Sequence, residues 1–311
     1  MGSEMCIRDR DTYGFATVGI WWLYPVFNAF NTSFERYYKE GGEWKPECIS
    51  ENMLEAVTFL KKCYDEKLLD PDFMSLTDDK KIENFVAGRD GIIFHNGGEH
   101  YNIIYNQFKS AYPDKDPKDM FTYLTEPLAG PDGTERIDGG LAYWAATAIR
   151  GDIEENKRDK ALELLEFMCS PEGSKLCSLG EPGVDYKEED GRYISLLPES
   201  EMGTPLTLGE KNNSANFLHM VGWSDTSYTA SNAQNYEEVL ESTKAFNKAA
   251  VVDPLLLVSV SDKVDSAEIK QLKDAVYEGL AKLITQSADL ERDFKTYTEN
   301  WKSVGGDNYT K

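Results

Sequence analysis

The side chains best suited to chemistry in this chain are aromatic, and they lie in or beside glycine-containing loops that also carry Asn and Glu. The candidate ligand-binding residues are Trp21, Trp22, Asn96, Gly98, Glu99, Tyr101, Trp144 and Trp223. A neutral sugar presents an apolar C–H face and many hydroxyls, so its site stacks that face on Trp or Tyr and binds the hydroxyls through amides and carboxylates. These residue types predict a carbohydrate site. A charged substrate would require convergent Arg or Lys, and few lie near these loops.

The Trp doublet lies in the most aromatic segment, residues 19–30, which contains Trp21-Trp22-Leu23-Tyr24-Pro25. Successive side chains leave a strand on opposite faces and leave a helix about 100° apart. Trp21 and Trp22 therefore cannot both point into one core. We expect one indole to face a cleft or solvent, although core packing stays the alternative for either ring taken alone.

A second candidate segment combines a strand with a glycine-rich loop. Gly91-Ile92-Ile93-Phe94-His95 predicts a buried strand, and Asn96-Gly97-Gly98-Glu99-His100-Tyr101 predicts the start of a helix. The two glycines would let a ligand approach the backbone closely, and the free amides of a helix start would donate hydrogen bonds. His95 is predicted to be a strand-end histidine with a structural role rather than a ligand contact.

Motifs for catalysis are missing from the sequence. It has no G-x-S-x-G, no P-loop, no dinucleotide fingerprint and no H-E-x-x-H, so no catalytic residue is predicted and the chain is not expected to be an enzyme. The runner-up function is a carbohydrate-active enzyme of the glycoside hydrolase kind, which needs two carboxyls about 5 to 10 Å apart. A third is a binder of a peptide or of a charged sugar acid.

Composition narrows the choice of partner. The 311 residues carry a formal charge of −22, which disfavours nucleic acid and anionic membrane surfaces. The five cysteines show no C-x-x-C spacing and there are three histidines, so no metal site is predicted; Cys63 and Cys169 are expected to be buried on inward helix faces. No window of 18 apolar residues predicts a membrane span.

Local patterns predict most of the regular elements. Helices are expected after Ser50, from Asp78 or Asp79 to Ala87, over 157–169, 171–179 and 234–248, after Ser266 and after Asp289. Strands are expected at 121–124, 137–149 and 251–260, with hairpins at 37–45 and 188–193. In the helix over 157–169, one apolar stripe should face a core: Ala161, Leu162, Leu164, Leu165 and Met168.

Three motifs carry a resemblance to a known family. The first is a short helix that begins at Ser170-Pro171-Glu172-Gly173 and is followed by the loop Gly180-Glu181-Pro182-Gly183-Val184-Asp185-Tyr186. The second is the helical motif over 55–73, which ends in Leu69-Asp70-Pro71-Asp72-Phe73. The third is the turn Pro127-Leu128-Ala129-Gly130-Pro131-Asp132-Gly133. Together they resemble the extracellular solute-binding proteins (family 1, maltose-binding-protein-like superfamily) of carbohydrate ABC transporters.

The resemblance implies an α/β, periplasmic-binding-protein-like two-lobe fold (type II), with ligand held between lobes that close on it. Residues 1–10 would be a non-native leader, 11–138 the second lobe, 139–184 a hinge crossing with a segment of the first lobe, and 185–311 a return to the second lobe with C-terminal helices. The first lobe would be largely missing from an N-terminally truncated chain, which is then expected to bind sugar weakly or not at all by itself.

The same resemblance implies the partners and the location. The partners would be a sugar or oligosaccharide and the permease subunits of an ABC transporter, with no nucleic acid, and the chain would be a monomer. The protein would be extracellular and held at the outer face of the cell membrane by a lipid anchor, or else it would be periplasmic. The lipid anchor would be absent from this chain. No cofactor is expected; a calcium loop would lie upstream of Asp11, which alone cannot supply six oxygens.

Overall fold

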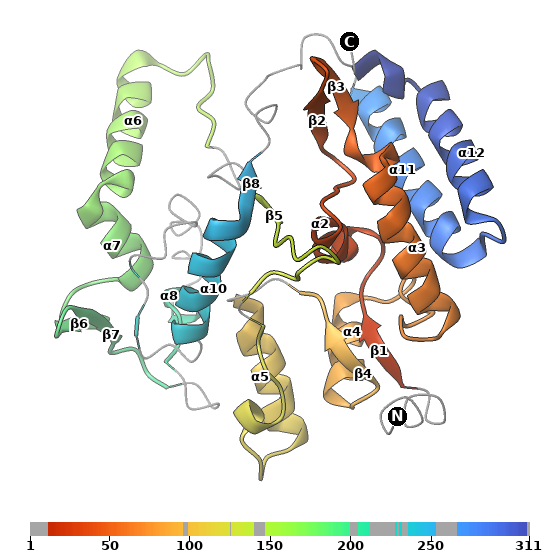
Figure 1. Ribbon diagram of the computed structural model, residues 1–311. Coiled ribbons are helices and arrows are strands. Elements are labelled where there is room, and N and C mark those ends of the chain that lie inside the picture. Colours follow the sequence, from red (N-terminus) through yellow and green to blue (C-terminus); the bar gives the residue numbers. More distant parts are fainter. Residues whose placement is uncertain are drawn as a thin grey trace. The chain divides into compact units, whose positions relative to one another are not determined.

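The computed structural model describes residues 12–95, 99–124, 126–139, 147–199, 205–211, 228, 230–231, 236–252 and 266–309 (Figure 1). The chain divides into two compact units. Unit 1 is formed by Met1–Gly139 and Ala245–Lys311, and unit 2 by Gly140–Lys244. The chain thus leaves unit 1 after Gly139 and returns to it at Ala245.

The core of unit 1 joins the two ends of the chain. Helix α3 (Glu51–Asp65) packs against α11 (Ser266–Gln286) and α12 (Leu290–Ser303), which lie side by side in Figure 1. Spacing predicts apolar stripes on all three helices, and their fully buried members are Met53, Val57, Leu60, Val276, Leu280, Leu283, Phe294, Tyr297 and Trp301. Ile269, the first residue predicted for the stripe of α11, is 38% exposed. The hydroxyl of Tyr297 donates to the backbone carbonyl of Cys48 at 3.0 Å and ties α12 to the 3₁₀ turn η2 (Glu47–Ile49).

Of the two helix caps predicted in unit 1, the cap at Ser50 is confirmed and the cap at Asp78 or Asp79 is wrong. The hydroxyl of Ser50 accepts from the amide of Met53 at 3.2 Å, and the carboxylate of Asp289 accepts from Arg292 N at 3.2 Å. Helix α4 (Asp78–Val86) is capped by Thr77, not by Asp78 or Asp79 as predicted. The Asp78 carboxylate is instead bonded to Lys81 one turn later.

Within the described part of unit 1, the strands pair in three short ladders. β1 (Tyr13–Ala16) runs parallel to β4 (Asp90–Ile93), and β2 (Tyr37–Glu40) forms the predicted hairpin with β3 (Glu43–Pro46). β5 (Ile137–Gly139) runs parallel to β8 (Ala250–Val252). The prediction of a buried strand at 91–95 is wrong for Ile92, which is 48% exposed because the face of the strand from which it projects is not covered.

The aromatic segment forms a 3₁₀ turn, η1 (Trp21–Leu23), followed by α2 (Tyr24–Ala29) with Pro25 in its first turn. Leu23, Val26 and Phe27 enter the main core. A second cluster forms where α4 meets α5 (Glu99–Ala111), and its buried members are Ile82, Val86, Ile104 and Phe108. α5 leads to a 3₁₀ turn, η3 (Pro117–Asp119).

Two predicted strands differ from the structure. Residues 121–124 form no strand; Phe121 stacks on Phe108 of α5 with ring centroids 5.1 Å apart, so side-chain packing takes the place of a ladder. The predicted strand over 137–149 is β5 up to Gly139, residues 140–146 lie outside the described part, and 147–149 are not in a strand. Of the predicted run at 251–260, Val251 and Val252 belong to β8, and the rest lies outside the described residues.

Unit 2 contains α6 (Glu155–Cys169), α7 (Pro171–Leu179), a hairpin of β6 (Tyr186–Glu189) with β7 (Arg192–Ser195), the short α8 (Leu208–Lys211) and most of α10 (Tyr236–Ala249). Ser170 caps α7 as predicted, accepting from Gly173 N at 3.1 Å. Gly180, at φ +86°, ends α7 in a conformation that favours glycine. In unit 1, a last 3₁₀ turn, η6 (Gly306–Tyr309), follows α12.

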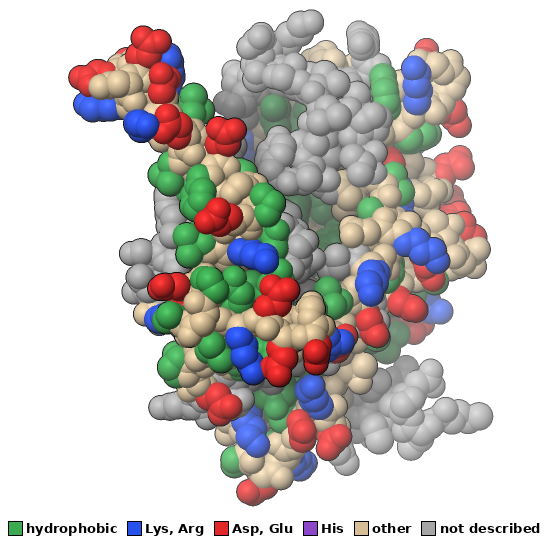
Figure 2. Space-filling model, turned by 90° about the vertical axis from the view of Figure 1, so that its left-hand side faces the viewer, with side chains coloured by type: hydrophobic (Ala, Val, Ile, Leu, Met, Phe, Trp, Pro, Cys, Tyr) green, Lys and Arg blue, Asp and Glu red, His purple; other side chains and the backbone are tan. Residues whose placement is uncertain are grey.

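The predicted core stripe of α6 is wrong. Leu162 and Leu164 are 50% and 57% exposed, and of the predicted stripe only Met168 is buried. Cys169 is exposed, against prediction, whereas Cys63 is buried as predicted. Within the described residues, α6 packs mainly on α7, which covers one end of the helix. Figure 2, which views the molecule from the side of α6 and α7, shows hydrophobic side chains at the surface between charged ones.

Candidate functional site

Trp22 is the predicted site residue that the structure places most distinctively. Its indole is half-buried, and the Nζ of Lys81 lies over it, 4.7 Å from the ring centroid. The His95 ring meets it edge to face, with centroids 5.5 Å apart and planes at 85°. Three elements therefore hold this indole: η1 carries it, α4 supplies the cation, and the segment that follows β4 supplies the imidazole.

Trp21 has a different environment from its neighbour. It is 48% exposed, and its ring lies 5.6 Å from that of Phe34. The expectation that the two indoles do not share one core agrees with this arrangement. Trp21 offers an exposed aromatic surface, whereas Trp22 offers a partly covered ring in a fixed environment.

Tyr101 is buried inside an aromatic cluster. It is 4% exposed, and its ring lies 5.2 Å from Phe121, 5.8 Å from Tyr123 and 6.4 Å from Tyr105. The structure thus places Tyr101 among packed rings of unit 1. Such a side chain supports neighbouring surface residues more readily than it stacks on a ligand.

The other predicted site residues fall outside what the structure describes. Asn96, Gly98, Trp144 and Trp223 lie outside the described residues, and Glu99 is the first residue of α5, with a side chain that the structure does not describe. Of the eight candidates, the structure therefore locates the side chains of Trp21, Trp22 and Tyr101.

Sequence reasoning missed Lys81, which lies beside Trp22, and Tyr24, two residues after Trp22 in the chain. Lys81 is buried under Trp22, and its only sequence signal is the i, i+3 spacing from Asp78. Tyr24, half-buried in the first turn of α2, has a pKa raised by burial and, to a lesser degree, by Tyr123 and Asp138. Its phenol is therefore neutral at physiological pH and can both donate and accept hydrogen bonds.

A buried charge network anchors the strands by which the chain leaves and re-enters unit 1. The Asp138 carboxylate of β5 accepts from Arg36 at 3.0 Å and from Arg136 at 3.1 Å. With its amide nitrogen turned toward the same carboxylate, Asn28 donates to both oxygens at 3.1 Å. Arg36 also donates to the backbone carbonyls of Gly139, at 3.1 Å, and of Val251. Both β5 and β8 are thus bonded to one guanidinium.

The second arginine extends the network to η2. Arg136 is 5% exposed and donates to Glu47 at 2.8 Å and to the side-chain oxygen of Asn31 at 3.0 Å. Burial raises the pKa of Glu47, and Arg136 offsets only part of that effect. The network is a structural anchor in which each charge has a partner. Removing one partner would leave the remaining buried charges less well compensated.

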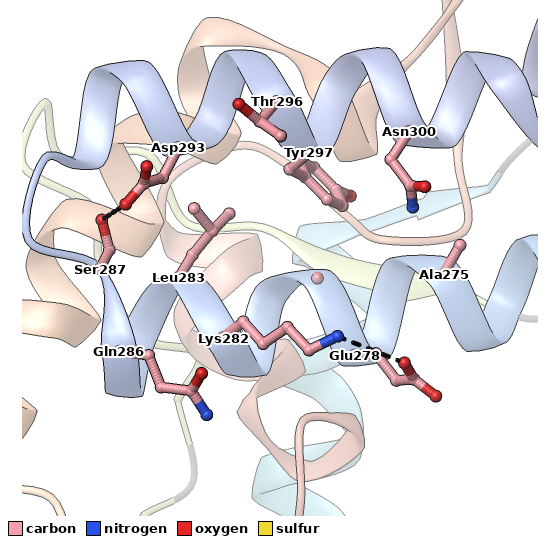
Figure 3. Close-up of a pocket in the computed structure, with 11 residues that line it drawn as sticks. Ala275, Glu278, Lys282, Leu283, Gln286, Ser287, Asp293, Thr296, Tyr297 and Asn300 are labelled. Atoms are coloured by element: carbon pink, nitrogen blue, oxygen red, sulfur yellow. Dashed lines mark hydrogen bonds and ion pairs between the residues drawn. The ribbon is translucent and has the colours of Figure 1, made fainter.

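A polar groove of about 480 Å³ lies between α11 and α12. Figure 3 shows Tyr297 between the two helices and polar side chains on both sides. Ser287 donates to Asp293 at 2.8 Å, and Lys282 pairs with Glu278 at 3.6 Å. None of the predicted site residues lines this groove. Ser287 and Tyr297 are buried at its floor, whereas most of its other polar side chains are exposed and some are already paired, which suits a solvated surface groove.

The described residues offer little for metal binding or catalysis. They contain no group of three or more His, Cys, Asp or Glu side chains placed to hold a metal ion. Burial raises the pKa of Cys48 to about 12 and that of Cys63 to about 11, so neither thiol ionises near neutral pH. The neighbouring acids Asp70 and Asp90 are 0% and 2% exposed, which closes them to a substrate.

Two curated proteins of Bacillus subtilis (strain 168) match this chain over nearly its whole length. "Lipoprotein LipO" is 26% identical over 97% of this chain and 59% of its own length. "Polygalacturonan/rhamnogalacturonan-binding protein YtcQ" is 22% identical over 95% of this chain and 57% of its own length. The chain thus spans somewhat more than half the length of these relatives. No family model matches it.

Solved structures share its fold. The alginate-binding protein AlgQ2 aligns with a TM-score of 0.56 and 14% identity, over 98% of this chain and 64% of that protein. The S. pneumoniae ABC-transporter substrate-binding protein FusA, in complex with fructo-nystose, aligns with a TM-score of 0.58 and 14% identity, over 99% and 65% respectively.

The fold is that of the two-lobe solute-binding proteins, as the sequence predicts. The motifs around Pro71, Pro127 and Ser170 first indicated a resemblance to solute-binding proteins, and these matches confirm that resemblance at the level of the fold. In the described residues, no helix has both the length and the apolar character that a membrane crossing requires.

Proposed function

We propose that this chain belongs to the extracellular substrate-binding component of an ABC importer, which binds a sugar or oligosaccharide and delivers it to the permease. The observation that carries the proposal is the half-buried Trp22, held by Lys81 and His95. A ring fixed in one orientation, with part of its surface open, is the element that stacks on the C–H face of a sugar at low entropic cost.

The relatives support a carbohydrate ligand. YtcQ is named for binding polygalacturonan and rhamnogalacturonan, AlgQ2 for binding alginate, and FusA was solved with fructo-nystose. The name of LipO and the solute-binding class of the structural neighbours support an extracellular or periplasmic location, with a lipid anchor at the outer face of the membrane as the finer proposal.

The chemistry around Trp22 favours a neutral sugar over an acidic one. The ammonium of Lys81 is fully buried, and it is bonded to Asp78 and to the Phe94 carbonyl. It therefore cannot pair with the carboxylate of a uronic acid. An acidic sugar, of the kind for which YtcQ and AlgQ2 are named, would need accessible cations elsewhere in the site. The charge of the sugar that binds best therefore distinguishes a neutral-sugar site from an acidic-sugar site.

The relatives support a protein that binds its sugar without cleaving it, since YtcQ and AlgQ2 are named for binding. The alternative, a glycoside hydrolase, needs two facing carboxyls open to substrate. Beside Trp22, the carboxylate of Asp78 is committed to the ion pair with Lys81. Incubation with labelled oligosaccharides, followed by chromatography, separates the two functions because a binding protein returns them unchanged.

The direct test is calorimetry with a panel of neutral and acidic oligosaccharides: maltotriose, kestose and trigalacturonate. Trp22→Ala should abolish or strongly weaken binding of the preferred sugar. The matched control is Trp44→Ala on β3, which removes a half-buried indole that also lies near a lysine, with Lys39 Nζ 5.7 Å from its ring centroid. Equal losses from both variants, or no binding of any sugar by the wild-type chain, would count against the proposal.

The length of this chain affects how tightly it is expected to bind a sugar. Because the relatives extend well beyond the aligned region, we propose that this chain by itself binds sugar more weakly than a polypeptide that includes the remainder of such a protein. Size-exclusion chromatography with light scattering tests the accompanying proposal that the chain is a monomer.

A further inference from the structure

Lys81 is a fully buried lysine in a helix that otherwise buries Ile82, Asn84 and Val86. A buried ammonium is costly unless its donors are satisfied and its charge is paired. All three of its N–H groups can be accounted for. One donates to Asp78 at 2.9 Å, one donates to the backbone carbonyl of Phe94 at 2.7 Å, and the third can point toward the face of Trp22.

These contacts join parts of unit 1 that are distant in sequence. Asp78 lies in the first turn of α4, Phe94 directly follows β4, and Trp22 lies in η1. His95, which meets the Trp22 indole edge to face, is the residue after Phe94. One ammonium therefore fixes both the indole and the backbone that presents the imidazole against it.

We propose that Lys81 is a positioning residue for saccharide binding, which holds the Trp22 indole in the orientation on which a sugar ring stacks. The proposal rests on the proposed function. Because Lys81 is 0% exposed, it touches no ligand and acts through Trp22 and through the Phe94 carbonyl beside His95. An apolar residue at this position would fill the space without orienting the ring, since the cation–π attraction and the bond to Phe94 would both be lost.

The first test observes the indole itself. The protein is labelled with 5-fluorotryptophan, which gives one ¹⁹F resonance for each of the 6 tryptophans, and Trp22→Phe assigns the Trp22 signal. Lys81→Met should shift or broaden that signal more than the others. The matched control is Lys80→Met, which removes an exposed lysine of α4 that pairs with Glu83 at 2.9 Å. A Trp22 signal that is unchanged in Lys81→Met would overturn the proposal.

The second test measures coupling by titrating the preferred sugar of the panel into four proteins: wild type, Lys81→Met, Trp22→Ala and the double variant. Lys81→Met alone should weaken binding about tenfold, the size of effect expected for a desolvated cation–π contact. In the Trp22→Ala background, where any residual binding no longer uses the indole, the same change should weaken binding less than about twofold. Equal losses in both backgrounds would show a merely structural role.

Lys81→Gln guards against loss of folding in Lys81→Met, because it removes the charge but keeps N–H donors that can point toward the Phe94 carbonyl, on a side chain one atom shorter. It should shift the Trp22 resonance and weaken binding in the same direction. If sugar binding and the Trp22 signal both survive in Lys81→Gln, the role of Lys81 is refuted while the proposed function stands. If no variant, wild type included, binds any sugar, the proposed function fails and the role of Lys81 fails with it.

Discussion

Asp90 offers a quantitative test of how burial shapes this fold. It begins β4 opposite Tyr13 of β1 and is 2% exposed. Burial, reinforced by the neighbouring carboxylate of Asp70, raises the pKa of Asp90 from its ordinary value of 3.8 to about 6, while Arg89 and Asn84 offset only part of that shift. The perturbation is Asp90→Asn, which keeps the shape of the side chain and removes the charge.

The expected magnitude follows from linkage. A shift of roughly 2 units at 1.36 kcal/mol each is worth about 3 kcal/mol. The folded pKa lies above the unfolded one, so the folded state holds the proton more tightly between about pH 4 and pH 6. The charged carboxylate therefore destabilises the fold fully above about pH 6 and not at all below about pH 4. Asp90→Asn should be more stable than wild type by up to about 3 kcal/mol at pH 7, and the gap should close toward pH 4.

The assay is urea denaturation of both proteins at pH 7.0, 5.5 and 4.5, with the free energy of unfolding compared at each pH. Carboxyls that do not interact with Asp90 titrate identically in the two proteins, so the difference reports the Asp90 charge together with its repulsion from Asp70. Asp114→Asn, an exposed carboxyl in the loop after α5, is the matched control and should leave the free energy nearly unchanged at every pH. A variant less stable than wild type at pH 7, or a gap that does not depend on pH, would refute the reasoning.

Three further predictions follow from contacts in unit 1 and unit 2. Tyr297→Phe should lower the free energy of unfolding by about 1–2 kcal/mol in urea denaturation, because it leaves the buried carbonyl of Cys48 without its donor. Arg36→Met should cost about 3 kcal/mol or more in the same assay, because it removes one of the two cations paired with the Asp138 carboxylate and the donor that binds the Gly139 and Val251 carbonyls. In native thiol labelling with a disulfide reagent, Cys169 should react before Cys48, because it is exposed whereas burial holds the Cys48 thiol neutral.

Each of these has a control. Tyr38→Phe, on the exposed hairpin, should change the unfolding free energy by less than about 0.5 kcal/mol, and so should Lys62→Met, whose ion pair with Glu66 spans 4.0 Å at the surface. Equal effects of Arg36→Met and Lys62→Met would show that the network around Asp138 adds nothing to stability. Labelling of Cys48 as fast as that of Cys169 would mean that α12 and η2 open readily in the native state.

The elements whose signals are local were predictable from the residues. Ser50, Ser170 and Asp289 cap their helices because a short polar side chain can satisfy free amides within the same turn. The stripes of α3 and α12 are buried because spacings of three and four residues put apolar side chains on one face. Such rules depend only on near neighbours in the chain, and so did the motifs that indicated the solute-binding fold.

Where the signal is not local, the sequence was insufficient. The same three- and four-residue spacing occurs in α6, yet Leu162 and Leu164 are exposed, because an amphipathic stripe shows which face can be buried and not whether a partner covers it. The pattern at 121–124 is typical of a strand, but in the structure this segment forms no strand and Phe121 stacks on the ring of Phe108.

The sequence by itself determined which kinds of side chain a sugar site would need and that Trp21 and Trp22 could not share one core. The tertiary structure alone decided that Trp22 is the ring that is held, because Lys81 and His95 reach it from segments that lie far along the chain. Long-range contacts of this kind depend on how the whole chain packs, and no spacing rule along the sequence encodes them.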